Sequence, residues 1–112
     1  MKVLHVITNL DDGGAQTVLL RLAAADAADS HAVVSLTDEG IFGARLAAAG
    51  VPVRAVGLPR GRVTAAGLAF LVRAVRAARP DVVQTWMYHA DLLGVVAARL
   101  AGSRAVVWGI RN

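Results

Sequence analysis

Short apolar runs alternate along this chain with longer segments in which apolar residues recur at helical spacing. The short runs are rich in β-branched residues and are bounded by turn residues, so each is predicted to be a strand. The predicted strands are Val3–Ile7, His31–Thr37, Val53–Val56, Asp81–Trp86 and Arg104–Trp108. Strands that alternate with helices over short connections predict an α/β fold, a Rossmann-like open parallel sheet of about five strands with helices on both faces.

The helices are bounded by capping and breaking residues. The first follows the glycine pair and is expected to fade near Ala28 and Asp29, and the second spans Ile41–Ala49. The third begins after Thr64, a suitable N-cap, and ends at Pro80. The fourth covers Leu92–Ala101. Gly50 and Gly102 stand where C-terminal caps are expected.

Three loops are predicted to meet at one edge of this sheet. In open α/β sheets, ligands bind beyond the carboxyl ends of the strands, and the first and fourth strands are usually neighbours. The loops Asn9–Gln16, Trp86–Asp91 and Gly109–Asn112 would then form one crevice. The first of them leads into a helix N-terminus, whose unpaired N–H groups and dipole favour an anionic ligand.

The first loop contains the pair Gly13-Gly14, which lets a ligand approach the main chain closely. A tight turn that needs a positive φ is the alternative explanation. The loop lacks G-x-G-x-x-G, although Asp38 and Glu39 stand where a ribose-binding acid of a nicotinamide enzyme would lie. A Walker loop is excluded because no Gly-Lys-Ser/Thr follows.

The second and third loops carry further candidates. His89 is a candidate general base or hydrogen-bond donor, with capping of the next helix as the alternative. One of Trp86 and Tyr88 is expected to line the crevice, and Arg111 is a candidate phosphate clamp. His5 and His31 lie within or at the start of strands, which indicates structural roles. The scattered histidines do not suggest a metal site.

Composition narrows the class of protein. The 112 residues contain no cysteine, so a disulfide framework and a thiolate metal site are excluded. The first residues lack the hydrophobic region of a signal peptide, and no charge-free run has the length of a bilayer span. We therefore expect a cytoplasmic protein. The net charge of +4 favours anionic partners, yet an arginine-rich composition explains it equally well.

Three segments resemble one enzyme family. Val3–Leu10 with Gly13-Gly14-Ala15-Gln16, then Arg79–Gly94, then Val106–Asn112 are similar to the N-terminal domain of family 4 retaining glycosyltransferases of the GT-B type. Members of that family commonly begin with a strand, the sequence G-G-A-E and a helix. The similarity extends in order over nearly the whole chain.

The resemblance implies transfer of a sugar from a nucleotide-sugar donor to a sugar or lipid-linked acceptor, with retention and without a required metal or other cofactor. It implies that Gly13, Gly14 and Gln16 lie near the donor diphosphate, with His89 and Arg111 as catalytic candidates. The residues expected to face the acceptor are Asn9, Trp86, Tyr88 and Asn112.

The chain departs from the family pattern at two of these positions. Gln16 stands where glutamate is common, and Arg111 falls where many members carry histidine. Residues 1–112 are expected to be one acceptor-side domain, truncated before the C-terminal domain that holds most of the donor. This fragment alone is expected to be inactive or nearly so.

Other functions remain open at this stage. A non-catalytic Rossmann-like nucleotide-binding or regulatory module is the main alternative, and an NAD-dependent oxidoreductase is a weaker one. Nucleic acid is not an expected partner. The arginines near the third helix accompany an ordinary buried stripe, which favours a solvated face over peripheral contact with the inner face of an anionic membrane. These arginines are Arg60, Arg62, Arg73, Arg76 and Arg79.

Overall fold

The strands of the computed structural model form one parallel sheet in the order β3-β2-β1-β4-β5. The structure describes residues 1–10, 14–26, 28–58, 64–86, 96–102 and 106–110. The strands are β1 (Lys2–Ile7), β2 (Ser30–Ser35), β3 (Val53–Ala55), β4 (Val82–Trp86) and β5 (Val106–Ile110). The helices with defined bounds are α1 (Gly14–Ala25), α2 (Gly40–Ala48) and α3 (Ala65–Ala78), and residues 96–100 are also helical.

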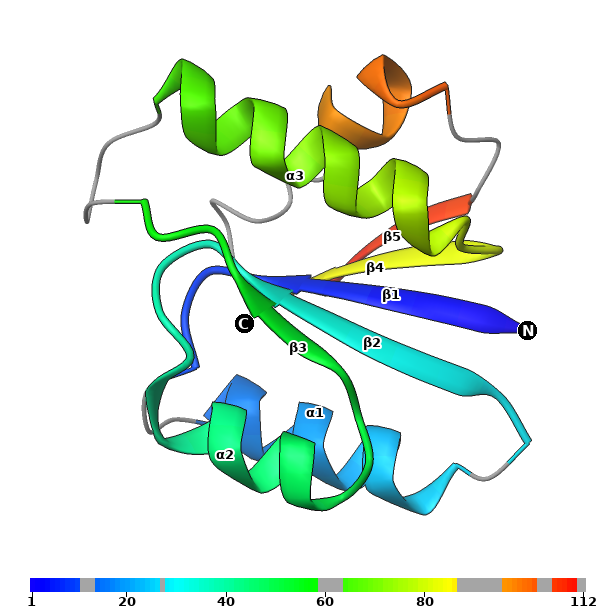
Figure 1. The fold of residues 1–112 in the computed structure, drawn as a ribbon. Coiled ribbons are helices and arrows are strands. Elements are labelled where there is room, and N and C mark those ends of the chain that lie inside the picture. Colours follow the sequence, from blue (N-terminus) through cyan, green and yellow to red (C-terminus); the bar gives the residue numbers. More distant parts are fainter. Residues whose placement is uncertain (11–13, 27, 59–63, 87–95, 103–105, 111–112) are drawn as a thin grey trace.

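Helices cover both faces of the sheet, as the alternating pattern predicted. α1 and α2 lie on one face, whereas α3 and the helical residues 96–100 lie on the other (Figure 1). The strands run in the same direction, so all their carboxyl ends lie at one edge. β1 lies between β2 and β4, which confirms the predicted neighbourhood of the first and fourth strands.

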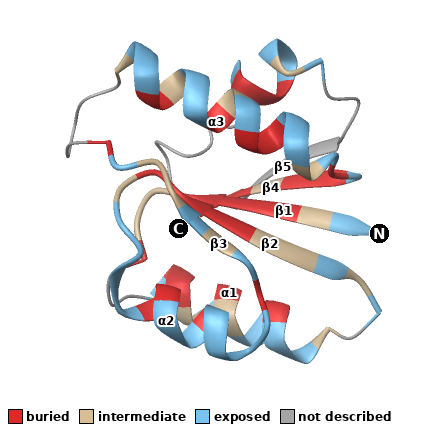
Figure 2. Ribbon diagram, in the orientation of Figure 1, coloured by how far each residue is buried: buried red, intermediate tan, exposed pale blue. Residues whose placement is uncertain are grey.

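Each face of the sheet has its own hydrophobic cluster because side chains of successive strand residues point to opposite faces. Leu4 and Val6 of β1 pack with Leu71 and Val75 of α3. On the other face, Ile7 packs within a cluster formed largely by α1, α2 and Trp86. The central strands are accordingly the most buried part of the molecule (Figure 2).

Three predicted element ends were wrong by two or three residues, and one of them is that of β2, which ends at Ser35 rather than at Thr37. α1 ends at Ala25 rather than near residue 28, because the Asp26 carboxylate accepts the N–H of Ala28 at 3.1 Å and turns the chain. β5 extends to Ile110 because its register follows β4 to the end, where Trp86 pairs with Ile110. Gly109 therefore belongs to the strand and not to the following loop.

Candidate functional site

The carboxyl end of β1 and the start of α1 form the core of the candidate site. β1 ends at Ile7, and α1 begins at Gly14, which is exposed. A Cβ placed on Gly14 would meet no atom within 4 Å, and its φ is not among the positive ones. Neither packing nor backbone conformation within the described residues requires glycine here. A side chain at Gly14 would instead occupy open space at the first residue of α1.

Electrostatics at this helix end favour an anion. The first turn of α1 contains no acidic residue, so the partial positive charge of its N–H groups is not offset within the helix. Such an end can hold a phosphate through main-chain donors. Gly13, the other glycine of the pair, lies outside the described residues.

Gln16 holds the turn that leads into α1. Its side chain is 4% exposed, and its Nε2 donates to the main-chain oxygen of Asn9 at 3.1 Å and to Asn9 Oδ1 at 2.9 Å. Both amide hydrogens are thereby directed at Asn9, a half-buried residue. The structure thus gives Gln16 a role in fixing the turn, and its expected place near a diphosphate stays a prediction.

Two hydroxyl groups near this edge were missed by the sequence analysis. Within the described part of the chain, the buried Thr8 Oγ1 and Ser35 Oγ have no hydrogen-bond partner. The Thr8 carbonyl accepts from Thr37 Oγ1 at 3.3 Å, which ties the ends of β1 and β2 together. The sequence could have indicated the Thr8 and Ser35 hydroxyls, because each belongs to a hydroxyl residue at the end of a buried strand.

The expectation that Trp86 faces an acceptor needs correction. Trp86 is 2% exposed and belongs to the hydrophobic cluster under α1 and α2. Its indole N–H donates to His5 Nδ1 at 3.0 Å. The cause is the alternation of strand residues, which points Trp86 to the same face of the sheet as Ile7, its register partner.

The remaining predicted site residues lie outside the described residues. These are His89, Tyr88, Arg111 and Asn112, and their predicted roles stay predictions. Among the residues that the structure describes, no group of His, Cys, Asp and Glu is arranged to hold a metal ion. In the same residues, no helix has the length and apolar character needed to cross a bilayer.

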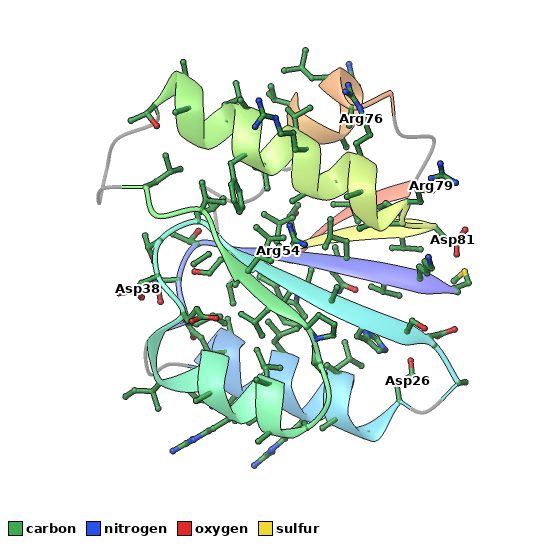
Figure 3. All side chains as sticks on the ribbon, in the orientation of Figure 1. Asp26, Asp38, Arg54, Arg76, Arg79 and Asp81 are labelled. Atoms are coloured by element: carbon green, nitrogen blue, oxygen red, sulfur yellow. The ribbon has the colours of Figure 1, made fainter. Side chains whose placement is uncertain are left out.

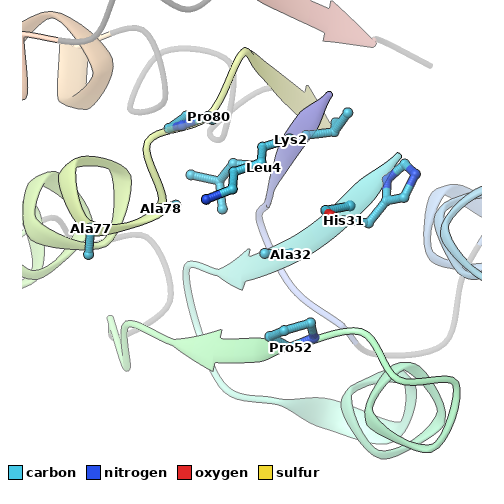
Figure 4. Close-up of a pocket in the computed structure, with 10 residues that line it drawn as sticks. Lys2, Leu4, His31, Ala32, Pro52, Ala77, Ala78 and Pro80 are labelled. Carbon is cyan, nitrogen blue, oxygen red and sulfur yellow. The ribbon is translucent and has the colours of Figure 1, made fainter. Parts of the chain in front are cut away.

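A pocket of about 230 Å³ lies at the opposite edge of the sheet. Figure 4 shows Lys2 and Leu4 of β1 directed toward Ala78 and Pro80, with Pro52 at the lower side. Its lining comes mainly from strand starts and from the C-terminal end of α3. This pocket is therefore separate from the candidate site, which lies at the carboxyl edge beside the N-terminus of α1.

Comparisons with known proteins agree with this geometry. Residues 12–111 match the family model described as Glycosyltransferase Family 4. Among solved structures, the MurG crystal structure from Acinetobacter baumannii matches with a TM-score of 0.65 at 17% identity. The match covers 96% of this chain and 33% of that of MurG, so the chain spans about a third of that protein's length. No curated protein sequence gave a match.

Proposed function

Because the chain belongs to glycosyltransferase family 4, we propose that the complete protein transfers a sugar from a nucleotide-sugar donor to an acceptor with retention at the anomeric carbon. The described sheet would be the acceptor-side half of a GT-B enzyme. A C-terminal domain would contribute most of the donor site. The reaction would need no metal, since prearranged N–H donors and cations can stabilise a departing diphosphate.

The open space at Gly14 is the observation that carries this proposal. Glycine is not required there by φ or by packing, yet any side chain would stand in front of the α1 N-terminus. The donor diphosphate is the anionic group that such an enzyme must hold at a main-chain surface. Gly13 and Gly14 would therefore approach the diphosphate, while Gln16 fixes the turn through Asn9.

The acceptor and the transferred sugar would lie on the β4 and β5 side of this edge. We assign His89 as the general base or hydrogen-bond donor and Arg111 as a cation toward the phosphate or sugar. Asn9, Tyr88 and Asn112 would supply polar contacts to the acceptor. These assignments rest on the order of the strands, because β4 and β5 follow β1 directly across the sheet.

A donor screen on the full-length protein tests the proposal. UDP- and GDP-sugars are expected to raise the melting temperature and to be consumed when an acceptor is present, and product NMR is expected to show a retained anomeric configuration. Stabilisation by NAD alone would favour the oxidoreductase alternative. Binding of a nucleotide without any sugar transfer would favour the non-catalytic module.

One surface supports peripheral membrane contact by the same enzyme. α3 and the helical residues 96–100 adjoin, and Arg76 Nη2 donates to the Leu100 carbonyl at 3.5 Å (Figure 3). Neither segment contains an acidic residue. The basic-apolar surface consists of exposed Phe70, Arg73, Arg76, Val96, Arg99 and Leu100. The exposed apolar residues beside the arginines would supply the apolar contact with a bilayer surface.

Vesicle sedimentation tests this contact. The full-length protein is expected to bind vesicles with anionic headgroups and to be released by salt. Replacing Arg73 and Arg99 by glutamine should weaken binding by about thirtyfold, since each basic residue near an anionic surface contributes about 1 kcal/mol. The exposed Arg45, on the opposite face of the sheet, provides the matched control. Equal binding to neutral vesicles would argue against the contact.

A further inference from the structure

Four polar side chains form a hydrogen-bonded chain beneath the α1 and α2 face of the sheet. Trp86 Nε1 lies 3.0 Å from His5 Nδ1, and His5 Nε2 lies 2.8 Å from His31 Nδ1. His31 Nε2 in turn lies 2.9 Å from Asp26 Oδ2. The chain connects the carboxyl end of β4, through β1 and β2, to the residue that follows α1.

The chemistry of its two ends fixes every proton in this chain. The indole N–H of Trp86 can only donate, so His5 Nδ1 accepts and the His5 proton lies on Nε2. That proton is donated to His31 Nδ1, which leaves the His31 proton on Nε2. From there it is donated to the Asp26 carboxylate, an acceptor. Both imidazoles are therefore neutral and have the same tautomer.

A proton added to either imidazole breaks a link of this chain. The three links need three donors and three acceptors, and all six roles are filled. A proton on His31 Nδ1 would face the N–H at His5 Nε2. If the His5 proton moved to Nδ1 to avoid this, that N–H would face the indole N–H of Trp86. Two donors that face each other at hydrogen-bond distance lose the bond and repel.

The surroundings offer little to offset such a loss. His5 is fully buried, Trp86 is 2% exposed and the His31 side chain is 5% exposed. The adjacent titratable groups are Asp26, Asp29 and the Met1 ammonium, which bonds Asp29 at 2.9 Å. Charged residues on the helices that cover this face and at the strand starts are exposed: Arg21, Glu39, Arg45, Lys2 and Asp81.

We propose that this chain makes Trp86 a positioning residue, which fixes the end of β4 at the candidate site only while His5 and His31 are both neutral. Trp86 is the last residue of β4. The polypeptide continues from it into residues 87–95, which include Tyr88 and His89 in the sequence. The link to the acceptor side rests on the proposed function. The dependence of the Trp86 indole hydrogen bond on the charge of the two imidazoles rests on the hydrogen-bond geometry alone.

The pKa of His5 agrees with this arrangement. Burial, and secondarily the neighbouring His31, lowers that pKa from 6.5 to about 4. The pKa of the Asp26 carboxyl is also lowered, chiefly by its bond to His31. The first direction favours a neutral His5 imidazole, and the second favours an ionised Asp26 carboxylate at neutral pH.

NMR titration of the imidazoles in the full-length protein tests the chain first. Trp86→Phe retains an aromatic ring but removes the donor, so His5 Nδ1 becomes free to carry a proton. The pKa of His5 is then expected to rise above about 4 but to stay below 6.5, because burial and the neighbouring His31 still lower it. Val83→Ala, which trims a fully buried side chain on the other face, is the matched control. It should lower stability and leave that pKa unchanged.

Hydrogen exchange measures the positioning role directly. Trp86→Phe is expected to speed amide exchange about tenfold in the peptide covering β4 and residues 87–95, because a main anchor of the indole is lost. In wild type, the protection factors of the same peptide, which correct for the slower intrinsic exchange at low pH, should fall as the pH falls from 6.5 toward 4. In Trp86→Phe, lowering the pH should cause little further loss of protection in this peptide.

Several results would overturn the proposal. An unchanged His5 pKa in Trp86→Phe, an equal shift in Val83→Ala, or unaltered exchange after β4 would each do so. If sugar transfer is observed, the KM for the acceptor should rise in Trp86→Phe more than the KM for the donor. If no transfer occurs in wild type, the proposed function fails, while the titration and the exchange experiment still decide the role of Trp86.

Discussion

At the scale of single residues, the turn between β1 and α1 depends on the donors of one amide. Gln16 Nε2 bonds both the main-chain oxygen and Oδ1 of Asn9. The resemblance to family 4 would have suggested glutamate here, but a carboxylate cannot donate to a carbonyl oxygen. The structure therefore explains why glutamine suits this chain.

Gln16→Glu is expected to destabilise the protein by about 1–3 kcal/mol, because the half-buried Asn9 loses the two hydrogen bonds from Gln16 Nε2 and its oxygens face an anion. Chemical denaturation of the full-length protein measures this change. The loss should diminish at acidic pH, where the new carboxyl can be protonated. A variant as stable as wild type would show that the turn does not depend on this amide.

His5 is expected to make stability depend on pH. Its pKa in the folded state, about 4, is below the ordinary 6.5, so the unfolded chain binds the proton more readily between these values. The free energy of unfolding should therefore rise by about 3 kcal/mol as pH increases through this window. Asp26 acts in the same direction, since its lowered pKa stabilises the fold above the ordinary 3.8.

Hydrogen exchange at β1, measured in the full-length protein, checks this dependence. His5→Gln should flatten the dependence between pH 6.5 and 4 while lowering stability at neutral pH. A pH response that survives unchanged in the variant would assign it to other groups.

At the scale of elements, α3 is fixed at its start by one side chain. Thr64 Oγ1 accepts the N–H of Gly67 at 3.0 Å, which satisfies one of the unpaired donors of the first turn. Gly67 also packs against Leu58, and a Cβ there would overlap the leucine side chain. The N-cap predicted from the sequence is thereby confirmed.

Thr64→Ala is expected to cost about 1 kcal/mol of stability, as the loss of an N-cap usually does. Thermal unfolding of the full-length protein measures it, and Thr64→Ser, which keeps the hydroxyl, should restore most of the loss. If serine and alanine behave alike, the cap does not stabilise the helix.

Sequence patterns predicted the elements well where a local signal exists. The order of strands and helices and the Thr64 cap follow from periodicity and capping residues. The neighbourhood of β1 and β4 follows from the usual strand order of open α/β sheets. The end of β5 did not follow, because it is set by pairing with β4 far away in the chain. α3 ends with Arg79 in the left-handed region at φ 45°, where sequence rules favour glycine.

At the candidate site, the sequence predicted part of the backbone but not the burial of Trp86. The sequence predicted that a helix follows the glycine pair, and α1 begins at Gly14 itself. The burial of Trp86 and its bond to His5 depend on the alignment of β1 with β4, which one residue's context does not reveal. His5 and His31 were correctly assigned structural roles, although their bond to each other was not predicted.

At the scale of the whole molecule, two edges of one sheet have different properties. The carboxyl edge holds the open α1 N-terminus, the Gln16–Asn9 turn and the unpartnered Thr8 hydroxyl of the described residues. At the amino edge, Lys2 N–H and Asp81 Oδ2 join β1 to the start of β4 at 2.8 Å. The membership in glycosyltransferase family 4 gives the carboxyl edge its proposed role.

Calorimetry tests this account most directly. It would measure the affinity of the nucleotide-sugar selected by the donor screen for the full-length wild type and for the full-length Gly14→Val variant. The valine side chain would enter empty space, so the melting temperature should be unchanged within a few degrees. We predict that donor affinity falls at least about tenfold in the variant, since a β-branched side chain would stand where the diphosphate approaches the α1 amides. Equal affinity in the two proteins would contradict the account.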